Sequence, residues 1–286
     1  MTSPVVVVVG QLARDIVLSV PAMPAGGAAA DVTSRRETLG GKGANQAVAV
    51  AQLGARVALV AVAGDDVIGD QLLGRAARDG VEVSCVVRRP GTLTGLIVEA
   101  LEDDGTWRYL QHLPEPVLLT AGDVDHAADL LRHAGAVMVQ AQQPPAAVGR
   151  ALRHAREGGA LVVLDGVPEP GHLALADVVR ADEQEARLLG GSADDVLAAG
   201  PGMVAFGAPN GNLFAWKDRR WGEGELFLPL GDGPVVDTTG GGDSFTAALT
   251  IALLLGETPP EAARRAVQAS AATVRHPGGR PDLRGV

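Results

Sequence analysis

The chain has 286 residues, a net charge of −10 at pH 7 and a hydrophobic content of 47%. This length fits one large α/β domain or two small ones, and the apolar content is ample for a packed core. The acidic balance argues against nucleic acid as a main partner, because a phosphate backbone attracts clustered Lys and Arg. It does not argue against a nucleotide. The single cysteine, Cys85, excludes an intrachain disulfide framework and a cysteine-based zinc site.

No segment reaches the ~18 continuous apolar residues that a membrane span requires. The N-terminus also lacks a basic stretch followed by a long apolar one. We therefore expect a soluble cytoplasmic protein that has no membrane partner.

The first predicted element is a buried strand of a parallel sheet at 5–9, a run of five valines. Asp15 lies just beyond it. Ligands of open α/β sheets bind outside the carboxyl ends of strands, so Asp15 is well placed for one. A solvated loop acid is the alternative, and this segment alone favours it. No G-x-G-x-x-G follows the strand, which disfavours a dinucleotide-binding oxidoreductase.

A glycine-rich segment at 40–43 leads into a helix that we expect to end near Gly54, a common residue after a helix C-terminus. Lys42 and Asn45 fall in the first turn of this helix. A cation is unfavourable there because the helix N-terminus is already positive. A ligand contact and an exposed lysine therefore remain open as explanations. The spacing is not that of a P-loop.

Two β-rich excursions interrupt the chain at about 13–38 and 94–112. Short strands at 16–20 and 32–38 are expected to pair, and 94–101 with 107–110 read as a hairpin around an Asp-Gly turn. No helix follows the hairpin, so we expect the two excursions to pair and form a small lid. If the lid exposes apolar faces, a homodimer through it is expected.

Between and after the excursions, strands and helices alternate, which predicts an α/β fold with a mostly parallel central sheet. Strands are expected at 56–63, 81–87, 136–140, 161–165, 177–180 and 203–206, with antiparallel edge strands at 213–216 and 225–228. Helices are expected after Asp66, which fits a cap, and at 123–133, 146–156, 183–189 and 259–274. The acids at 182–185 either satisfy a helix dipole or act through Mg²⁺.

The most informative segment is 235–255, where a β-branched run meets Gly240, Gly241 and Gly242, then Asp243 and a long apolar helix. Uncovered N–H groups at a helix N-terminus form an anion site, most naturally for phosphate. Asp243 at its mouth is either the N-cap of the helix or a general base for an attacking hydroxyl.

Gly40-Gly41-Lys42-Gly43-Ala44-Asn45-Gln46-Ala47 and Asp237-Thr238-Thr239-Gly240-Gly241-Gly242-Asp243-Ser244-Phe245 resemble the two signatures of the ribokinase (PfkB-type) carbohydrate kinases. The resemblance covers essentially the whole chain as a single domain, 1–286. It implies a ribokinase-like three-layer fold with the β-lid inserted. It also implies transfer of the γ-phosphoryl group of ATP to a sugar hydroxyl, expected to be primary, with Mg²⁺ and K⁺ as candidate cofactors.

The resemblance also implies residue roles. Asp243 would be the general base, with Gly240, Gly241 and Gly242 as the anion hole. The sugar would be held by Asp15, Gly41, Lys42, Asn45 and Gln142. The nucleotide would lie against Asp182, Glu185, Gly207, Thr238, Ala269 and Ser270. Glu185 would organise Mg²⁺ through water, while Asp237 and Thr239 would border a monovalent-cation site with the loop at 277–282.

The sequence departs from the family pattern at four positions. Ala13 replaces an asparagine and Gln142 a glutamate on the sugar side, Asp182 replaces the asparagine of Asn-x-x-Glu, and the glycine turn has one extra glycine. Each lost polar contact to a sugar hydroxyl costs ~1 kcal/mol or more. We therefore expect an acceptor other than ribose. A nucleoside kinase and a non-catalytic sugar or nucleotide sensor of the same fold are the alternatives.

Overall fold

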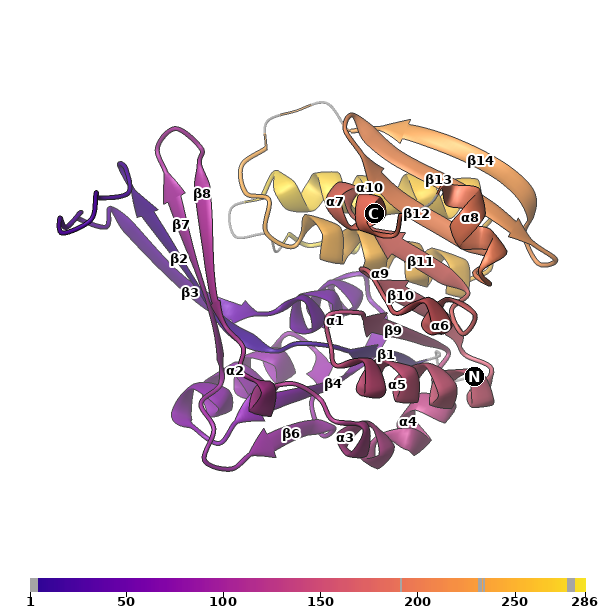
Figure 1. The fold of residues 1–286 in the computed structure, drawn as a ribbon, viewed down its shortest axis with the longest axis horizontal. Helices are drawn as coiled ribbons and strands as arrows, with labels where there is room; N and C mark the ends of the chain where they lie inside the picture. The colour runs from indigo at the N-terminus through magenta and orange to yellow at the C-terminus, as the bar shows by residue number, and fades with distance from the viewer. Residues whose placement is uncertain (1–4, 191, 231–232, 234, 277–280) are drawn as a thin grey trace.

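The computed structural model describes residues 5–190, 192–230, 233, 235–276 and 281–286 (Figure 1). Its main sheet has ten strands in the order β14-β13-β12-β11-β10-β9-β1-β4-β5, with β6 paired to β4. These strands are β1 (Val5–Val9), β4 (Arg56–Gly64), β5 (Val81–Glu82), β6 (Val86–Arg89), β9 (Ala136–Gln140), β10 (Leu161–Asp165), β11 (Val178–Ala181), β12 (Met203–Ala208), β13 (Gly211–Asp218) and β14 (Gly222–Pro229). The strands from β12 to β5 pair in parallel, and β13 and β14 add an antiparallel edge, as predicted.

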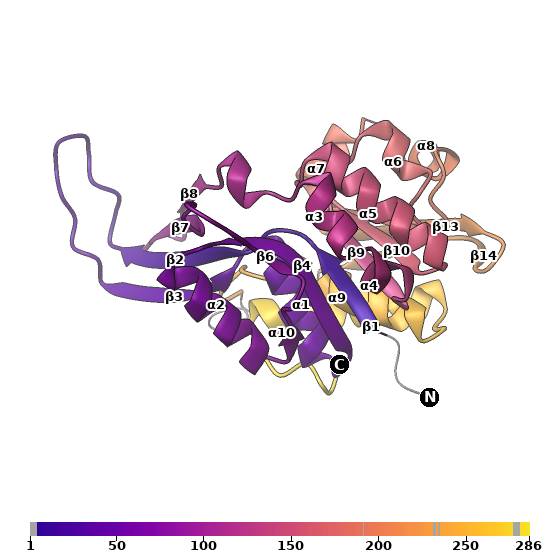
Figure 2. The same cartoon turned by 90° about the horizontal axis from the view of Figure 1, so that it is seen from below.

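Alternate residues of the central strands point to opposite faces of the sheet and pack in two separate cores. The fold therefore has three layers, with helices on both faces of the sheet. Val6 and Val8 of β1 pack with one cluster, and Val7 and Val9 with the other. The first core is covered by α1 (Lys42–Gln52), α2 (Val67–Arg78), α9 (Gly241–Leu254) and α10 (Pro259–Val274) (Figure 2). The second lies under α3 (Ala121–His126), α4 (Ala128–Arg132), α5 (Pro145–Gly158), α6 (Pro170–Leu173), α7 (Glu183–Leu188) and α8 (Ala193–Ala198). The predicted fold class is confirmed.

A second sheet projects from this body, at the upper left of Figure 1. Its strands run in the order β3-β2-β7-β8: β3 (Ser34–Gly40), β2 (Ala13–Val20), β7 (Gly95–Glu102) and β8 (Trp107–His112). β2 pairs antiparallel with β3 and parallel with β7, so the two predicted excursions do pair. We call this four-stranded sheet the lid.

Several local predictions are also confirmed. Asp66 caps α2 by accepting a hydrogen bond from the N–H of Gly69. Gly54 follows α1 with a φ of +83°, a conformation that glycine adopts at little cost. In the part of the chain that the structure describes, no helix is long and apolar enough to cross a membrane.

Other predictions were wrong. The expected strand at 81–87 is two short strands, because the chain turns between them and the N–H of Val86 donates to the Val83 carbonyl. The expected helix at 123–133 breaks at Ala127 into α3 and α4. The short helices α6, α8 and η1 (Glu115–Val117) were not predicted, because each is too short to show a helical period.

Candidate active site

The glycine turn connects the loop at 235–239 to α9. Gly240 is the N-cap residue, with a φ of 75°, and the helix begins at Gly241. Asp243 therefore lies in the first turn, and the alternative that it is the N-cap is wrong. The N–H of Gly241 donates to the Thr238 carbonyl, whereas those of Gly242 and Asp243 have no acceptor among the described residues. These two groups are free to bind an anion.

Close contacts explain why the turn consists of glycines. A Cβ atom at Gly241 would lie 2.7 Å from Cγ1 of Val274, and one at Gly242 would lie 2.8 Å from Nη2 of Arg180. Real Cβ atoms essentially never approach a neighbour so closely. The absence of side chains thus lets α10 and a guanidinium group approach the start of α9.

Asp243 is buried, with 9% of its surface exposed. Its burial and the neighbouring carboxylate of Asp165 raise its pKa to about 7, against the opposing effects of Lys42, Arg180 and Gln46. A proton acceptor works best when its pKa is close to the operating pH. The surroundings of Asp243 thus give it the property that a general base needs.

Asp243 belongs to a buried charge cluster that also contains Lys42, Asp165, Arg180 and Glu185. Nζ of Lys42 lies 3.0 Å from Oε1 of Glu185, and Nη1 of Arg180 lies 3.0 Å from Oδ1 of Asp165. Burial works against the charged form of Lys42, but Asp165 and Glu185 outweigh it, so the pKa of Lys42 is raised. The cluster therefore holds three carboxylates and two firmly protonated cations.

The sheet and α1 bring these groups together. Asp165 and Arg180 stand opposite one another near the ends of adjacent parallel strands β10 and β11. Lys42 and Gln46 lie one turn apart on α1, and Nε2 of Gln46 donates to Oδ2 of Asp165 over 2.7 Å. The cluster thus lies at the carboxyl edge of the sheet, where ligands of this fold class bind.

The predicted sugar-side residues gather beside this cluster. Asp15 lies within β2 and is 4% exposed, so its interpretation as a solvated loop acid is wrong. It packs against Gly40, where a Cβ atom would lie within 1.8 Å of the carboxyl carbon. Gly41 has a φ of +83° and lies against the Gln11 carbonyl, to which the N–H of Ala44 donates over 3.0 Å.

Hydrogen bonds of side-chain amides link other residues on the side predicted to bind the sugar. Oε1 of Gln140 accepts from the N–H of Gln11 over 2.8 Å, and its Nε2 donates to Oε1 of Gln142 over 2.9 Å. A Cβ atom at Gly10 would lie 2.8 Å from Oε1 of Gln140, so the glycine leaves room for this amide. Asn45 follows in the first turn of α1, and its N–H donates to the Gly41 carbonyl. Gln11, Gln140 and Gln142 thus form a hydrogen-bonded chain beside Gly10, on the side predicted for the acceptor.

The predicted nucleotide side lies around α7 and α10. Asp182 and Glu185 form a reciprocal capping box, in which each side chain accepts from the backbone N–H of the other. A Cβ atom at Gly207 would lie 2.7 Å from the N–H nitrogen of Glu183, so β12 approaches this helix closely. Ser270 faces the glycine turn, while Ala269 is fully buried and its carbonyl lies 3.4 Å from Oγ of Ser244.

The carboxylate of Asp237 is already engaged by cationic and backbone donors. Its Oδ2 lies 2.7 Å from Nη2 of Arg36, and its Oδ1 accepts from the N–H of Thr239 over 2.9 Å. A guanidinium group so close to this carboxylate does not fit a monovalent cation bound to the same oxygens. Most of the loop predicted to complete that site, residues 277–280, lies outside the described residues. The site thus stays a prediction.

A cavity of about 660 Å³ lies between the lid and the loop at 235–239. Arg36, Glu99, Trp107 and Tyr109 face it from the lid. Burial, with contributions from Asp15, Glu99 and Asp243, raises the pKa of Tyr109. The lid thus forms one wall of a cavity whose other wall is the loop that leads into the glycine turn.

Comparison with known proteins agrees with this geometry. The model of the pfkB family of carbohydrate kinases matches residues 4–284. The chain belongs to that family. The ribokinase of Haemophilus influenzae is 26% identical over 301 residues, which cover 96% of this chain and 94% of the relative. The deoxyribokinase of Salmonella typhimurium is also 26% identical, over 84% of this chain and 82% of its own.

Solved structures give the same result. The structure of Arabidopsis thaliana ribokinase complexed with ribose and ATP aligns with a TM-score of 0.82 and 26% identity, covering 99% of this chain and 97% of that one. This pfkB-family protein is therefore a carbohydrate kinase, as its two signatures indicated.

Sequence reasoning missed Asp165, Arg180, Gln11 and Gln140 as site residues. A usable signal existed for all four of them. Asp165, Arg180 and Gln140 are polar residues at the carboxyl ends of buried strands that were correctly predicted. In an open α/β sheet, that position is where ligand-binding residues collect. Gln11 carries the same signal, because it lies two residues beyond the carboxyl end of β1, and its N–H donates to Oε1 of Gln140.

Proposed function

We propose that this pfkB-family chain transfers the γ-phosphoryl group of ATP to a hydroxyl, expected to be primary, of a small carbohydrate. The observation that carries this proposal is the buried Asp243, with a pKa of about 7, at the start of α9, where the N–H groups of Gly242 and Asp243 have no acceptor among the described residues. The Arabidopsis relative complexed with ribose and ATP supports the choice of both substrates.

In the proposed reaction, Asp243 accepts the proton of the attacking hydroxyl. The turn at Gly240, Gly241 and Gly242 presents N–H groups to the phosphoryl oxygens, where negative charge spreads during transfer. Lys42 lies at the boundary between the two substrates, held by Glu185, and adds positive potential beside the transferred group. Phosphoryl transfer depends almost entirely on such positioning and electrostatic stabilisation.

Mg²⁺ fits the donors that the chain offers. No group of three or more His, Cys, Asp or Glu side chains able to hold a metal occurs among the described residues. Mg²⁺ in kinases is bound chiefly by substrate phosphates and water, with one or two carboxylates nearby. Glu185 and Asp182, at the start of α7, are the carboxylates in that place. When bound, the ion would neutralise charge on the nucleotide phosphates.

The acceptor is proposed to be a sugar other than ribose. Ala13 is fully buried and presents no polar group, and the amide of Gln142, which accepts a hydrogen bond from Gln140, stands where the family pattern has a glutamate. Asp15, Gly41 and Asn45 remain as hydroxyl partners. Amides both donate and accept hydrogen bonds, so this site tolerates a different hydroxyl arrangement from one that contains a glutamate.

A nucleoside is the second candidate acceptor. The 660 Å³ cavity under the lid contains the faces or edges of Trp107 and Tyr109, which are suited to stacking against a base. A non-catalytic sensor of the same fold would have no need for an ionisable buried carboxyl such as Asp243.

A homodimer through the lid is proposed from its outer face. There Ile16, Val98 and Leu110 stand side by side on β2, β7 and β8, and Leu110 is 67% exposed. Leu110→Lys is expected to convert a dimer into a monomer in light scattering, with Thr106→Lys at the hairpin turn as control. A monomeric parent chain would contradict the proposal.

The cytoplasmic location stays a prediction of the sequence.

The function is tested by screening pentoses, hexoses and nucleosides for ADP release from ATP and Mg²⁺, with and without K⁺. We expect one acceptor class to give at least a tenfold rise in ADP release over the acceptor-free background, and phosphate to appear on the acceptor. If ATP binds but no acceptor raises ADP release, the sensor alternative replaces the kinase proposal.

A further inference from the structure

Arg180 is a buried cation that the predicted mechanism does not use. It lies on β11 opposite Asp165 of β10 and Ala205 of β12, and only 14% of its side chain is exposed. Its strand neighbour Val178 packs in the core beneath α9, so the guanidinium group extends toward the same helix. A buried arginine needs partners for its charge. Any terminal nitrogen that has no partner in the protein is available to a ligand.

The two terminal nitrogens of Arg180 have different surroundings. Nη1 donates to Oδ1 of Asp165 over 3.0 Å and lies 3.9 Å from Oε2 of Glu185. Nη2 donates to no described residue, and it lies 2.8 Å from the position that a Cβ atom would occupy at Gly242. One end of the guanidinium group is therefore anchored, and the other points at the first turn of α9.

The space at this turn is bordered by hydrogen-bond donors from two directions. The N–H groups of Gly242 and Asp243 have no acceptor in the part of the chain that the structure describes, and Nη2 of Arg180 approaches the same turn from β11. The ring of Phe245 lies 5.9 Å from Cζ of Arg180 and limits the directions in which the guanidinium group can move. A guanidinium group and backbone N–H groups together match the oxygens of a tetrahedral phosphoryl group.

We infer that Arg180 binds the phosphoryl group during its transfer, with Nη2 donating to a non-bridging oxygen while Nη1 stays on Asp165. This inference rests on the proposed function. In that reaction, the acceptor oxygen forms a bond to the γ-phosphorus, and the bond from that phosphorus to the bridging oxygen breaks. ADP leaves with the electron pair, and the acceptor proton moves to Asp243. Arg180 contributes positive charge and takes up no proton.

The first test uses nucleotide binding, which needs no acceptor. Arg180→Gln is expected to weaken binding of the β,γ-imido analogue of ATP about tenfold in calorimetry with Mg²⁺, because a phosphate contact is lost. ADP binding is expected to change less than twofold, since ADP lacks the γ-phosphoryl group. Equal loss of both nucleotides would show a structural role instead and overturn the inference.

The second test uses turnover with the best acceptor from the screen. Removal of one donor to the transition state costs ~10²-fold or more in kcat, so Arg180→Gln is expected to lose about that, with the acceptor KM nearly unchanged. Arg180→Lys is expected to recover part of this loss. Guanidinium at tens of millimolar is expected to raise the kcat of Arg180→Ala severalfold.

The matched control is Arg89, whose Nη2 lies 2.6 Å from Oδ2 of the buried Asp123 away from the cluster. Arg89→Ala removes a comparable ion pair, and guanidinium is expected to leave its kcat unchanged. An Arg180→Gln enzyme with kcat within threefold of the parent would overturn the inference and leave the kinase function intact. A parent chain that binds neither nucleotide would contradict both.

Discussion

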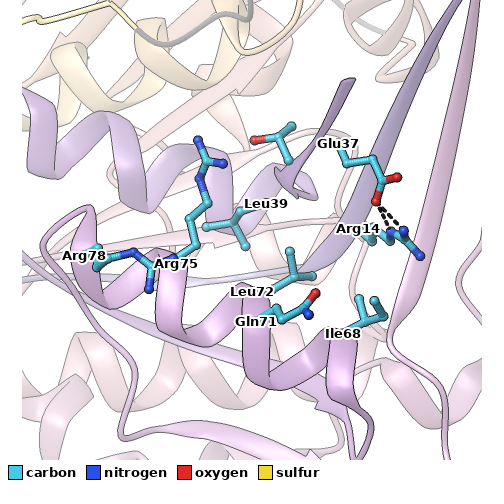
Figure 3. Close-up of a pocket in the computed structure, with 9 residues that line it drawn as sticks. Arg14, Glu37, Leu39, Ile68, Gln71, Leu72, Arg75 and Arg78 are labelled. Atoms are coloured by element: carbon cyan, nitrogen blue, oxygen red, sulfur yellow. Dashed lines mark hydrogen bonds and ion pairs between the residues drawn. The ribbon is translucent and has the colours of Figure 1, made fainter. Parts of the chain in front are cut away.

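Two sites in this protein contain arginine, the buried charge cluster and a cavity beside the lid, and they differ in what surrounds the guanidinium groups. Arg180 in the charge cluster contacts Asp165, which is 1% exposed, at the floor of the active site. Arg14, Arg75 and Arg78 instead line a cavity of about 200 Å³ between the lid and α2 (Figure 3). Arg14 pairs there with Glu37, and 47% of the Arg75 side chain is exposed.

The difference matters because solvent weakens the interaction of exposed charges. Exposed ion pairs contribute about 0–1 kcal/mol, whereas breaking a buried pair leaves a charge without compensation. Figure 3 shows Leu39, Ile68 and Leu72 among the cationic side chains, so the cavity has an apolar part. The carboxylate that lines it is that of Glu37, whose side chain is 30% exposed. We therefore expect substitutions in the cluster to change chemistry, and substitutions in the cavity to change little.

The largest effect is expected at Asp243. Asp243→Asn removes the proposed proton acceptor, so kcat is expected to fall about 10³-fold while nucleotide binding is retained. Steady-state kinetics and calorimetry measure the two effects, with Asp70→Asn on the surface of α2 as control. Turnover close to that of the parent would exclude Asp243 as the base.

The same substitution has an expected effect on stability, with a defined sign. The pKa of Asp243 is about 7 in the folded chain and 3.8 in a model compound, so the folded chain binds more protons between these values. Stability is therefore lost as the pH rises from about 4 to about 7. Thermal melts at pH 5 and pH 8 are expected to show that Asp243→Asn stabilises the chain at pH 8 relative to the parent. Equal melting temperatures of the parent and Asp243→Asn at pH 8 would contradict the raised pKa of Asp243.

The next effect is expected at Asp165. Its charge raises the pKa of Asp243, so Asp165→Asn is expected to move the acidic limb of the kcat profile below pH 7. The same change removes the main partner of Arg180 and is expected to lower the free energy of unfolding by about 3 kcal/mol. A pH–rate profile and urea unfolding measure the two effects. An acidic limb that stays in place would show that Asp165 does not influence the base.

A smaller effect is expected where the lid meets the body. Arg36 of β3 pairs with Asp237 of the loop before the glycine turn, and its side chain is 39% exposed. Arg36→Ala is expected to raise the acceptor KM about threefold and to increase the stimulation of turnover by K⁺, because the Asp237 carboxylate becomes accessible to a cation. Arg35→Ala, which affects a pair with Glu37 on the same strand, is the control. Unchanged K⁺ stimulation would show that Arg36 does not compete with the ion.

The smallest effect is expected in the cavity of Figure 3. Arg75→Ala breaks only a 4.0 Å contact with Asp79. Turnover is expected to stay within twofold of the parent, and the free energy of unfolding within about 0.5 kcal/mol. A tenfold change in turnover would show that this cavity is coupled to the active site and would remove the contrast between the two arginine groups.

The sequence predicted the glycine turn, Asp243, and the pairing of the two lid excursions from local patterns. Runs of valine, alternation of apolar and polar residues and clusters of glycine each extend over only a few positions, so the sequence shows them directly. Predictions were less successful at 81–87 and 123–133, where a turn or a helix break depends on single hydrogen bonds that no periodicity reports.

The sequence by itself therefore determined the α/β class, the family and the acid that we propose as the proton acceptor. Only the tertiary structure decided which charges surround that acid. Lys42 meets Glu185 across 143 positions, and Gln46 meets Asp165 across 119. The order of the strands in the sheet makes such pairs neighbours, because parallel strands end at one edge whatever their separation along the chain. The proposed role of Arg180 depends on its place at that edge, opposite Asp165 and beside the first turn of α9.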